Sequence, residues 1–368
     1  MHSWSDATTS RGDGNQTLMF AIHDVPFVVR SNDATVIAHV TRLVRRYSGG
    51  EPQTATGVQR VLVAVQGVPA LDASRLKDVP RRSGAHKPAR VATTDANGGR
   101  VIYRRDTDVM TYIQRNIWTI TGDLRAHPDE VTRALDAMLS LALVERGYLT
   151  LKSSAVTRDG VGIALVGGPD SARRALAVTL LTHGFQWVTE DLLLVRVTDG
   201  EIEMRGLPGM LRLNPGAMLA HPTLRAMLTE EERTRYDGQS WRELRELDTR
   251  YMVDAAETFG IEGVSSGSTL RAVIALRWRA SDPAESAALV PLARADAYEA
   301  LADASRSYGL YDLSGTLPPN YHRLSRIAET VMMRAISGSI AIEEAAIHIA
   351  QEIHAVSVAS PLVAPELA

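Results

Sequence analysis

Hydrophobic and polar positions divide the chain into a polar beginning, a mixed first part and a strongly apolar middle. Residues 1–17 are rich in Ser, Thr, Gly and Asp, and such a composition buries too little surface to offset the entropy of ordering. We expect a disordered tail there. Residues 18–147 alternate short apolar runs of strand length with two stretches of helical spacing, at Ala34–Tyr47 and from about His127 to Arg146. This pattern predicts a smaller N-terminal α+β domain.

The middle of the chain, residues 148–320, has longer apolar runs. A strand-like run over Gly162–Gly167 is followed by a loop, a helical stretch over Ser171–His183 and a further strand-like run over Gln186–Val197. Continuous apolar segments such as IALV are typical of strands buried on both faces, so we expect a sheet covered by helices. The pattern predicts an α/β core domain.

Residues 321–368 have apolar positions at helical spacing up to about Val356, followed by a segment with two prolines. This predicts a helical C-terminal region with a terminal tail. Gly338 lies inside the helical pattern and favours two helices over one.

Composition narrows the possible functions only in part. The chain has 40 Lys+Arg against 43 Asp+Glu, a formal charge of −3, so nothing indicates a nucleic-acid partner. It contains no cysteine, which excludes disulfides, a catalytic thiol, iron–sulfur clusters and thiolate zinc sites. The first residues lack an apolar signal region, and no later run approaches the roughly 18 apolar residues of a membrane span. We therefore expect a cytoplasmic protein that does not contact membranes.

The loop between the first strand and helix of the core reads GGPDSARRAL over residues 167–176. A strand, a tight loop and a helix form an anion site, because the free N–H groups at the helix start face the loop. A working phosphate loop reads GxxxxGK[ST]. Counted from Gly167, its last three positions hold Ala172, Arg173 and Arg174. The motif alone is weak, since a glycine pair after a strand is commonly an ordinary turn.

The surrounding residues are more specific. The run LKSSAVTRDGVGIALVGGPDSARRALAVTLLTHGFQWVTEDLLLVR, followed by GLPGMLRLNPGAML, resembles the HPr kinase/phosphorylase superfamily, and within it the group called HprK-related kinase B. The resemblance is specific over about residues 151–220, looser over 18–150, and fades after 230. It implies an HPr-kinase-like (PEP carboxykinase-like) P-loop core.

Carried over position by position, the resemblance implies that the chemistry of the phosphate loop has changed. The family's P-loop lysine falls on Arg173, its magnesium-binding serine on Arg174 and the next threonine on Ala175. Two loop glycines fall on Asp170 and Ala172. The lysine that contacts phosphates and the hydroxyl that binds the metal are therefore both missing.

Other family positions are retained. The acidic pair that serves magnesium and proton transfer in the family is present as Glu190 and Asp191, and Arg212 and Asn214 also match. The two acids are the candidate catalytic residues; with the lysine and serine gone, the alternative is a vestigial pair that belongs to the scaffold. The former phosphate loop and its flanking anion site comprise Gly167, Gly168, Asp170, Ser171, Arg173, Arg174, Arg212 and Asn214. The sequence predicts no metal site.

Electrostatics argue against a nucleotide at this loop. Asp170 would place a carboxylate among the phosphates, and at ~4 Å with an effective dielectric near 20 each pair of like charges costs about 4 kcal/mol. Pro169 removes one amide donor. We therefore expect no cofactor, with ATP and magnesium bound only if the chain is an active kinase after all.

Three interpretations of the loop stay open. Asp170 or Ser171 could cap the helix and pair with Arg173 or Arg174, so that the protein occupies its own anion site. The simpler possibility is an N-cap alone. In the third, the two arginines bind another anion, such as a phosphorylated peptide or a metabolite.

These observations predict an HPr-kinase-like protein with a degenerate nucleotide site, a pseudokinase that acts as a regulatory or scaffolding subunit. The alternative is an atypical ATP-dependent kinase that phosphorylates a serine or threonine of a protein or peptide. The resemblance implies protein partners, such as a peptide or a carrier protein, within a homo- or hetero-oligomer.

Overall fold

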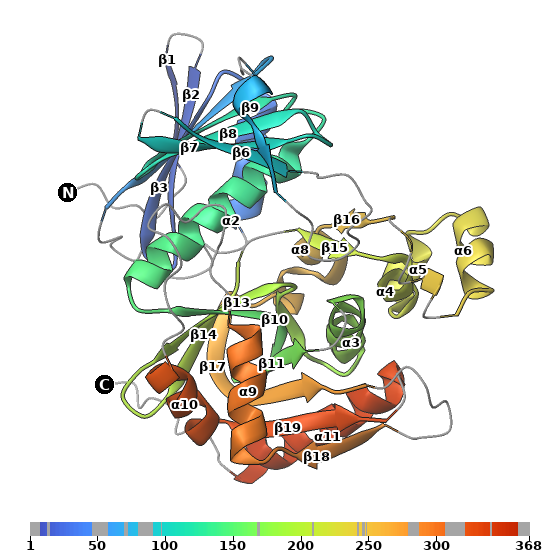
Figure 1. Ribbon diagram of the computed structural model, residues 1–368. Coiled ribbons are helices and arrows are strands. Elements are labelled where there is room, and N and C mark those ends of the chain that lie inside the picture. Colours follow the sequence, from blue (N-terminus) through green and yellow to red (C-terminus); the bar gives the residue numbers. More distant parts are fainter. Residues whose placement is uncertain are drawn as a thin grey trace. The chain divides into compact units, whose positions relative to one another are not determined.

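The computed structural model describes residues 8–12, 15–45, 58–69, 73–79, 91–96, 98–167, 170–207, 210–240, 243–244, 247, 249–278, 287–305, 321–338 and 341–359. The chain divides into two compact units, and the division falls between Arg146 and Gly147 (Figure 1). Both units mix helices and strands, as the apolar pattern predicts. None of the helices in these ranges is long and apolar enough to span a membrane.

The first unit is built on a sheet that has nine strands within the described ranges. β3 pairs with β4, and β4 with β9, in parallel; the other neighbours in the sheet are antiparallel. The spatial order is β1 (Thr8–Gly12), β2 (Asn15–Ile22), β3 (Val25–Ser31), β4 (Arg60–Gln66), β9 (Ile117–Gly122), β8 (Val109–Gln114), β7 (Gly99–Arg104), β6 (Val91–Ala96) and β5 (Lys77–Asp78). A short 3₁₀ helix, η1 (Ala73–Arg75), precedes β5.

Two helices, α1 (Ala34–Arg45) and α2 (Pro128–Glu145), pack on this sheet and on each other. Period-two burial explains which face they cover: in β2, Leu18, Phe20 and Ile22 are buried, whereas the residues between them are only half-buried. The alternation in the sequence thus sets the register of the strands.

The predicted disordered tail over residues 1–17 is wrong in part. Thr8–Gly12 and Asn15–Thr17 belong to β1 and β2, which pair with each other as an antiparallel hairpin at the edge of the sheet. Backbone hydrogen bonds to the neighbouring strand order this segment, and a polar composition does not prevent such pairing. Residues 1–7 and 13–14 lie outside the described ranges.

The second unit contains a sheet that closes on itself. Its ring is formed by β11 (Val161–Gly167), β10 (Leu149–Arg158), β13 (Leu192–Val197), β14 (Ile202–Arg205) and β17 (Gly267–Leu276). Parallel pairing of β17 with β11 completes the ring. β17 also extends past the ring and pairs with β19 (Met332–Ser337), which is followed by the edge strand β18 (Ala288–Pro291). β12 (Gln186–Thr189) pairs with β10.

Helices cover both faces of this sheet. α3 (Asp170–Thr182) and α11 (Ile342–Ala359) contribute to one apolar cluster, and α9 (Arg294–Ala304) and α10 (Tyr321–Thr330) to the other. Residues 163–166, the IALV run, alternate between the two clusters. The prediction of a strand buried on both faces is therefore confirmed.

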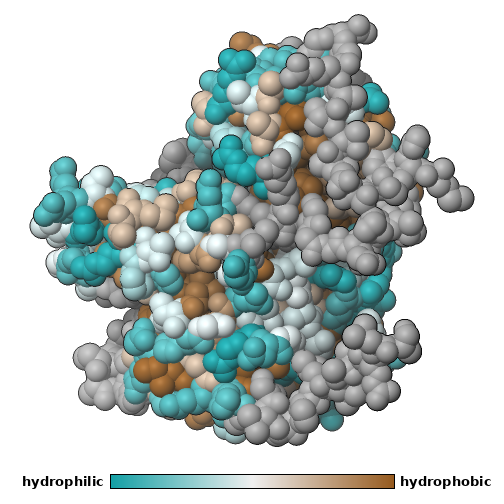
Figure 2. Space-filling model, turned by 180° about the vertical axis from the view of Figure 1, so that it is seen from behind, coloured by the Kyte–Doolittle hydropathy of each residue, from teal (hydrophilic) through white to brown (hydrophobic). Residues whose placement is uncertain are grey.

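Short elements complete the second unit. They are the two-stranded sheet of β15 (Leu211–Leu213) and β16 (Tyr251–Val253), the helices α4 (Pro215–Leu219), α5 (Pro222–Ala226), α6 (Glu230–Asp237) and α8 (Ala255–Phe259), and the 3₁₀ helix η2 (Ile261–Gly263). In the reverse view, hydrophilic residues cover much of the coloured surface and apolar ones form smaller groups between them (Figure 2).

The predicted helical C-terminal region is wrong for Met332–Ser337, which forms β19 instead of helix. This strand lies between β17 and β18, so it belongs to the sheet of the core. A short apolar run is compatible with a helix or with a buried strand, and here pairing on both edges decides the outcome. Gly338, which the sequence pattern places between two helices, follows directly after the strand.

Asp33 supports a prediction about the stability of the first unit. It is buried before α1, where its Oδ1 accepts hydrogen bonds from the backbone N–H and the hydroxyl of Thr35, at 2.8 and 2.6 Å. Its Oδ2 pairs with Arg125. Burial opposes ionisation, but the hydrogen bonds from Thr35 and the nearby guanidinium outweigh it and hold the pKa of Asp33 below its usual range.

We expect Asp33→Ala to lower the free energy of unfolding by about 1–2 kcal/mol at pH 7, the cost typical of a lost N-cap. Because the pKa is depressed in the folded state, the ionised side chain stabilises the fold above pH ~4, and this contribution disappears as pH falls through the folded-state pKa. Urea denaturation at pH 7 and pH 3 measures both effects. Asp199→Ala, at an exposed turn, is the control; an equal loss for Asp33→Ala at both pH values would contradict the prediction.

Candidate functional site

The strand–loop–helix unit predicted from the sequence is present in the second unit. β11 ends at Gly167 and α3 begins at Asp170. Gly167 has a φ of 70°, a left-handed conformation that favours glycine, so the turn out of the strand depends on this residue. Gly168 lies outside the described residues, as do the side chains of Asp170 and Ser171. The predicted cap by Asp170 or Ser171 therefore stays a prediction.

Arg173, at the lysine position of the phosphate-loop pattern counted from Gly167, has its side chain directed into the protein. Its side chain is 3% exposed. Nη1 donates a hydrogen bond to the carbonyl oxygen of Gly167 at 3.0 Å, and Nη2 lies 3.6 Å from Oδ1 of Asp191. The guanidinium thus contacts the backbone of its own loop and the carboxylate of Asp191, which lies between β12 and β13.

Arg174, the neighbouring residue of α3, lies beside the same acidic pair. Its Nε is 3.7 Å from Oε2 of Glu190, and its Nη2 is 3.6 Å from Oδ1 of Asp191. These separations exceed those of hydrogen bonds, so the contacts are ion pairs held by charge rather than by directed bonds. Arg174 and Glu190 are each 12% exposed.

The acidic pair occupies the turn between β12 and β13, and β10 fixes this turn. The hydroxyl of Ser154 donates to the carbonyl oxygen of Glu190 at 2.6 Å, and the backbone N–H of Ser153 donates to that of Asp191 at 3.1 Å. The two acids therefore stand on a backbone that strand pairing has already positioned. The pattern of the sequence did not single out these serines, because their role depends on which strand lies beside the turn.

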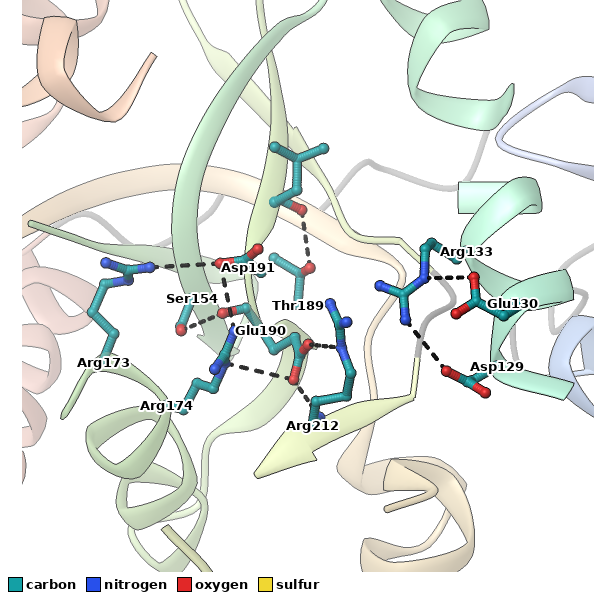
Figure 3. A network of polar contacts seen from close by, with 11 residues as sticks. Asp129, Glu130, Arg133, Ser154, Arg173, Arg174, Thr189, Glu190, Asp191 and Arg212 are labelled. Atoms are coloured by element: carbon teal, nitrogen blue, oxygen red, sulfur yellow. Dashed lines mark hydrogen bonds and ion pairs between the residues drawn. The ribbon is translucent and has the colours of Figure 1, made fainter. Parts of the chain in front are cut away.

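Arg212 on β15 completes the group. Its backbone N–H donates to Oε2 of Glu190 at 2.5 Å, and its Nε donates to Oε1 at 3.3 Å. Glu190 thus contacts arginines from two different elements (Figure 3). We refer to Arg173, Arg174, Glu190, Asp191 and Arg212 as the arginine–carboxylate cluster.

Asn214 is placed differently from the other predicted residues. It is buried before α4, where its Oδ1 accepts a hydrogen bond from the backbone N–H of Ala217 at 3.1 Å. This is the contact of a helix N-cap. Within the described part of the chain, no hydrogen bond or ion pair joins Asn214 to the cluster. The contacts above join Gly167, Arg173, Arg174, Glu190, Asp191 and Arg212.

The pairing of Arg173 and Arg174 with Glu190 and Asp191 was not predicted. The sequence suggested Asp170 or Ser171 as partners, because they are close along the chain. The observed partners lie some 17 residues further on, at the end of β12. Among the described side chains of this group, three guanidinium groups lie around two carboxylates.

Comparisons with known proteins give little beyond this geometry. No family model and no curated protein matches the chain. Among solved structures, the HPr(Ser) kinase/phosphatase from Coxiella burnetii is similar at 13% sequence identity with a TM-score of 0.30; the match covers 57% of this chain and 99% of that one.

Proposed function

We propose that this chain is an HPr-kinase-like pseudokinase, a non-catalytic protein that serves as a regulatory or scaffolding subunit of a partner complex. The observation that carries the proposal is the orientation of Arg173. A kinase needs a cation at this position directed at the phosphates. Arg173 is instead buried, bonded to the carbonyl of Gly167 and paired with Asp191.

The residues present do not fit magnesium with ATP. Residue 174 is an arginine without the hydroxyl that would bind the metal, and its guanidinium lies against both acids. A divalent cation beside Glu190 and Asp191 would face the positive charges of Arg173, Arg174 and Arg212. At ~4 Å and an effective dielectric near 20, repulsion between two unit charges is about 4 kcal/mol. The proposal therefore includes no phosphoryl transfer.

The first test is nucleotide binding by the chain and by a restored loop. We expect calorimetry to detect no heat of binding for ATP at up to 1 mM, with or without magnesium, because arginines and acids neutralise each other where phosphates would lie. The variant Asp170→Gly, Ala172→Gly, Arg173→Lys, Arg174→Ser returns the loop to the pattern of a working site, and we expect it to gain magnesium-dependent binding.

Arg173→Lys alone is the matched control, because it keeps the charge count and changes only the side chain. We expect it not to bind ATP. Micromolar affinity of the unaltered chain would contradict the proposal and favour the atypical protein or peptide kinase. A restored variant that is folded by circular dichroism yet does not bind would show that the loop is not the cause.

The second test separates a structural from a catalytic role of Asp191. We expect Asp191→Ala to lower the free energy of unfolding by about 1–2 kcal/mol, because Arg173 and Arg174 lose a shared counter-charge. A fully buried pair would cost about 3–5 kcal/mol, and partial exposure of Asp191 reduces this value. Urea denaturation measures the change, with Asp199→Ala as the control. Unchanged stability together with loss of a measurable phosphate transfer would contradict the structural role.

A further inference from the structure

The two-stranded sheet that carries Arg212 has an exposed residue directly beside it. In the β15–β16 register, Leu211 pairs with Val253, Arg212 with Met252, and Leu213 with Tyr251. Leu211, Leu213 and Val253 are buried. Because side chains alternate along a strand, Arg212 and Met252 share the opposite face. This places an apolar side chain next to a cation of the cluster.

Arg212 has donors that the cluster does not use. Glu190 takes its Nε and its backbone N–H, and Figure 3 shows the terminal nitrogens directed away from that carboxylate. Within the part of the chain that the structure describes, Nη1 and Nη2 make no hydrogen bond or ion pair of their own. The side chain is 37% exposed. Glu190 therefore orients the guanidinium of Arg212, and Nη1 and Nη2 can donate two parallel hydrogen bonds to an anion.

Met252 supplies the second element of a binding surface. It is 41% exposed, one of the large apolar side chains that the fold leaves open to solvent. Methionine adapts its shape to different apolar partners, which is why it is common at surfaces that bind peptides. A cation next to an apolar side chain matches a ligand with an anion next to an apolar group.

The charge of the cluster selects among such ligands. A carboxylate carries one negative charge, so Glu190 and Asp191 repel it less strongly than they repel a doubly charged group. A phosphoryl group carries close to two negative charges at pH 7 and would place them beside Glu190 and Asp191, the second of which is 37% exposed. A carboxylate is the better complement.

Resting on the proposed function, we propose that Arg212 and Met252 form a docking surface for an acidic peptide segment of the partner. A glutamate or aspartate of the partner pairs with Nη1 and Nη2 of Arg212, and an adjacent apolar residue packs on Met252. The surface thereby gives the pseudokinase a peptide to hold without any transfer of phosphate.

The test uses three fluorescein-labelled peptides, Gly-Ser-Leu-Glu-Leu-Ser-Gly and its counterparts with glutamine or phosphoserine at the central position. We expect fluorescence polarisation in 50 mM NaCl to give at least tenfold tighter binding of the glutamate peptide than of the glutamine peptide. Arg212→Gln should weaken the glutamate peptide about tenfold, because one charge-assisted pair is lost. Met252→Ser should weaken it several-fold, independently of charge.

Arg271→Gln is the matched control, since Arg271 is equally exposed at 38% and pairs with Glu201 elsewhere in the same unit. Its binding should equal that of the unaltered chain. Arg212→Gln keeps the backbone bond to Glu190, and circular dichroism verifies the fold. Equal affinity for the glutamate and glutamine peptides, preference for phosphoserine, no binding at 1 mM, or an equal loss with Arg271→Gln would each overturn the proposal.

A parallel titration with Mg-ATP keeps this inference distinguishable from the proposed function. Tight Mg-ATP binding would overturn the pseudokinase assignment whatever the peptides do. Absence of peptide binding, with ATP also unbound, would overturn the docking surface and leave the pseudokinase proposal in place.

Discussion

The site of the second unit depends on one constraint: a pair of adjacent acids and a pair of adjacent arginines must offset each other's charge. Two carboxylates adjacent in sequence repel each other, and cations close by offset that repulsion. Two adjacent guanidinium groups at the start of α3 need anions for the same reason. Each pair supplies the opposite charge that the other needs, so removal of one member leaves a half-buried charge without that compensation. The charges at the start of α3 and those of the acidic turn are therefore directed at each other.

The backbone around the cluster is fixed by contacts that involve no ligand. Ser153 and Ser154 on β10 hold the acidic turn, and Gly167 receives a hydrogen bond from Arg173. Arg212 arrives from a separate two-stranded sheet. Strand pairing within one unit thus positions these side chains, and no bound molecule is needed to organise them. This is the arrangement expected of a surface used for recognition, where order before binding lowers its entropic cost.

Much of the fold could be predicted from periodicity, and the failures have physical causes. The strand-like run at 163–166 and the helix that follows it were predictable because burial on both faces leaves a distinctive apolar run. β19 was not, because six residues of mixed apolar character fit a helix as well as a strand until their neighbours are known. In the site, the loop pattern pointed to Arg173 and Arg174, and the resemblance alone pointed to Glu190, Asp191 and Arg212. Their partners were not predicted, because Glu190 and Arg212 meet through tertiary contacts that no local spacing encodes.

β17 belongs to two structures at once, the closed ring with β11 and the extension with β19. The second half of β17, residues 272–276, must pair with a strand on each side. One partner, β11, lies about 110 residues earlier in the chain, and the other, β19, about 60 residues later. Such distant pairings are slow to form, because chain entropy is lost before any contact compensates for it. Until β19 arrives, a hydrophobic strand edge is bare and open to association with other chains. Assembly of this sheet is therefore a stage at which the chain is open to aggregation, and the arrival of β19, about 60 residues after β17, ends that exposure.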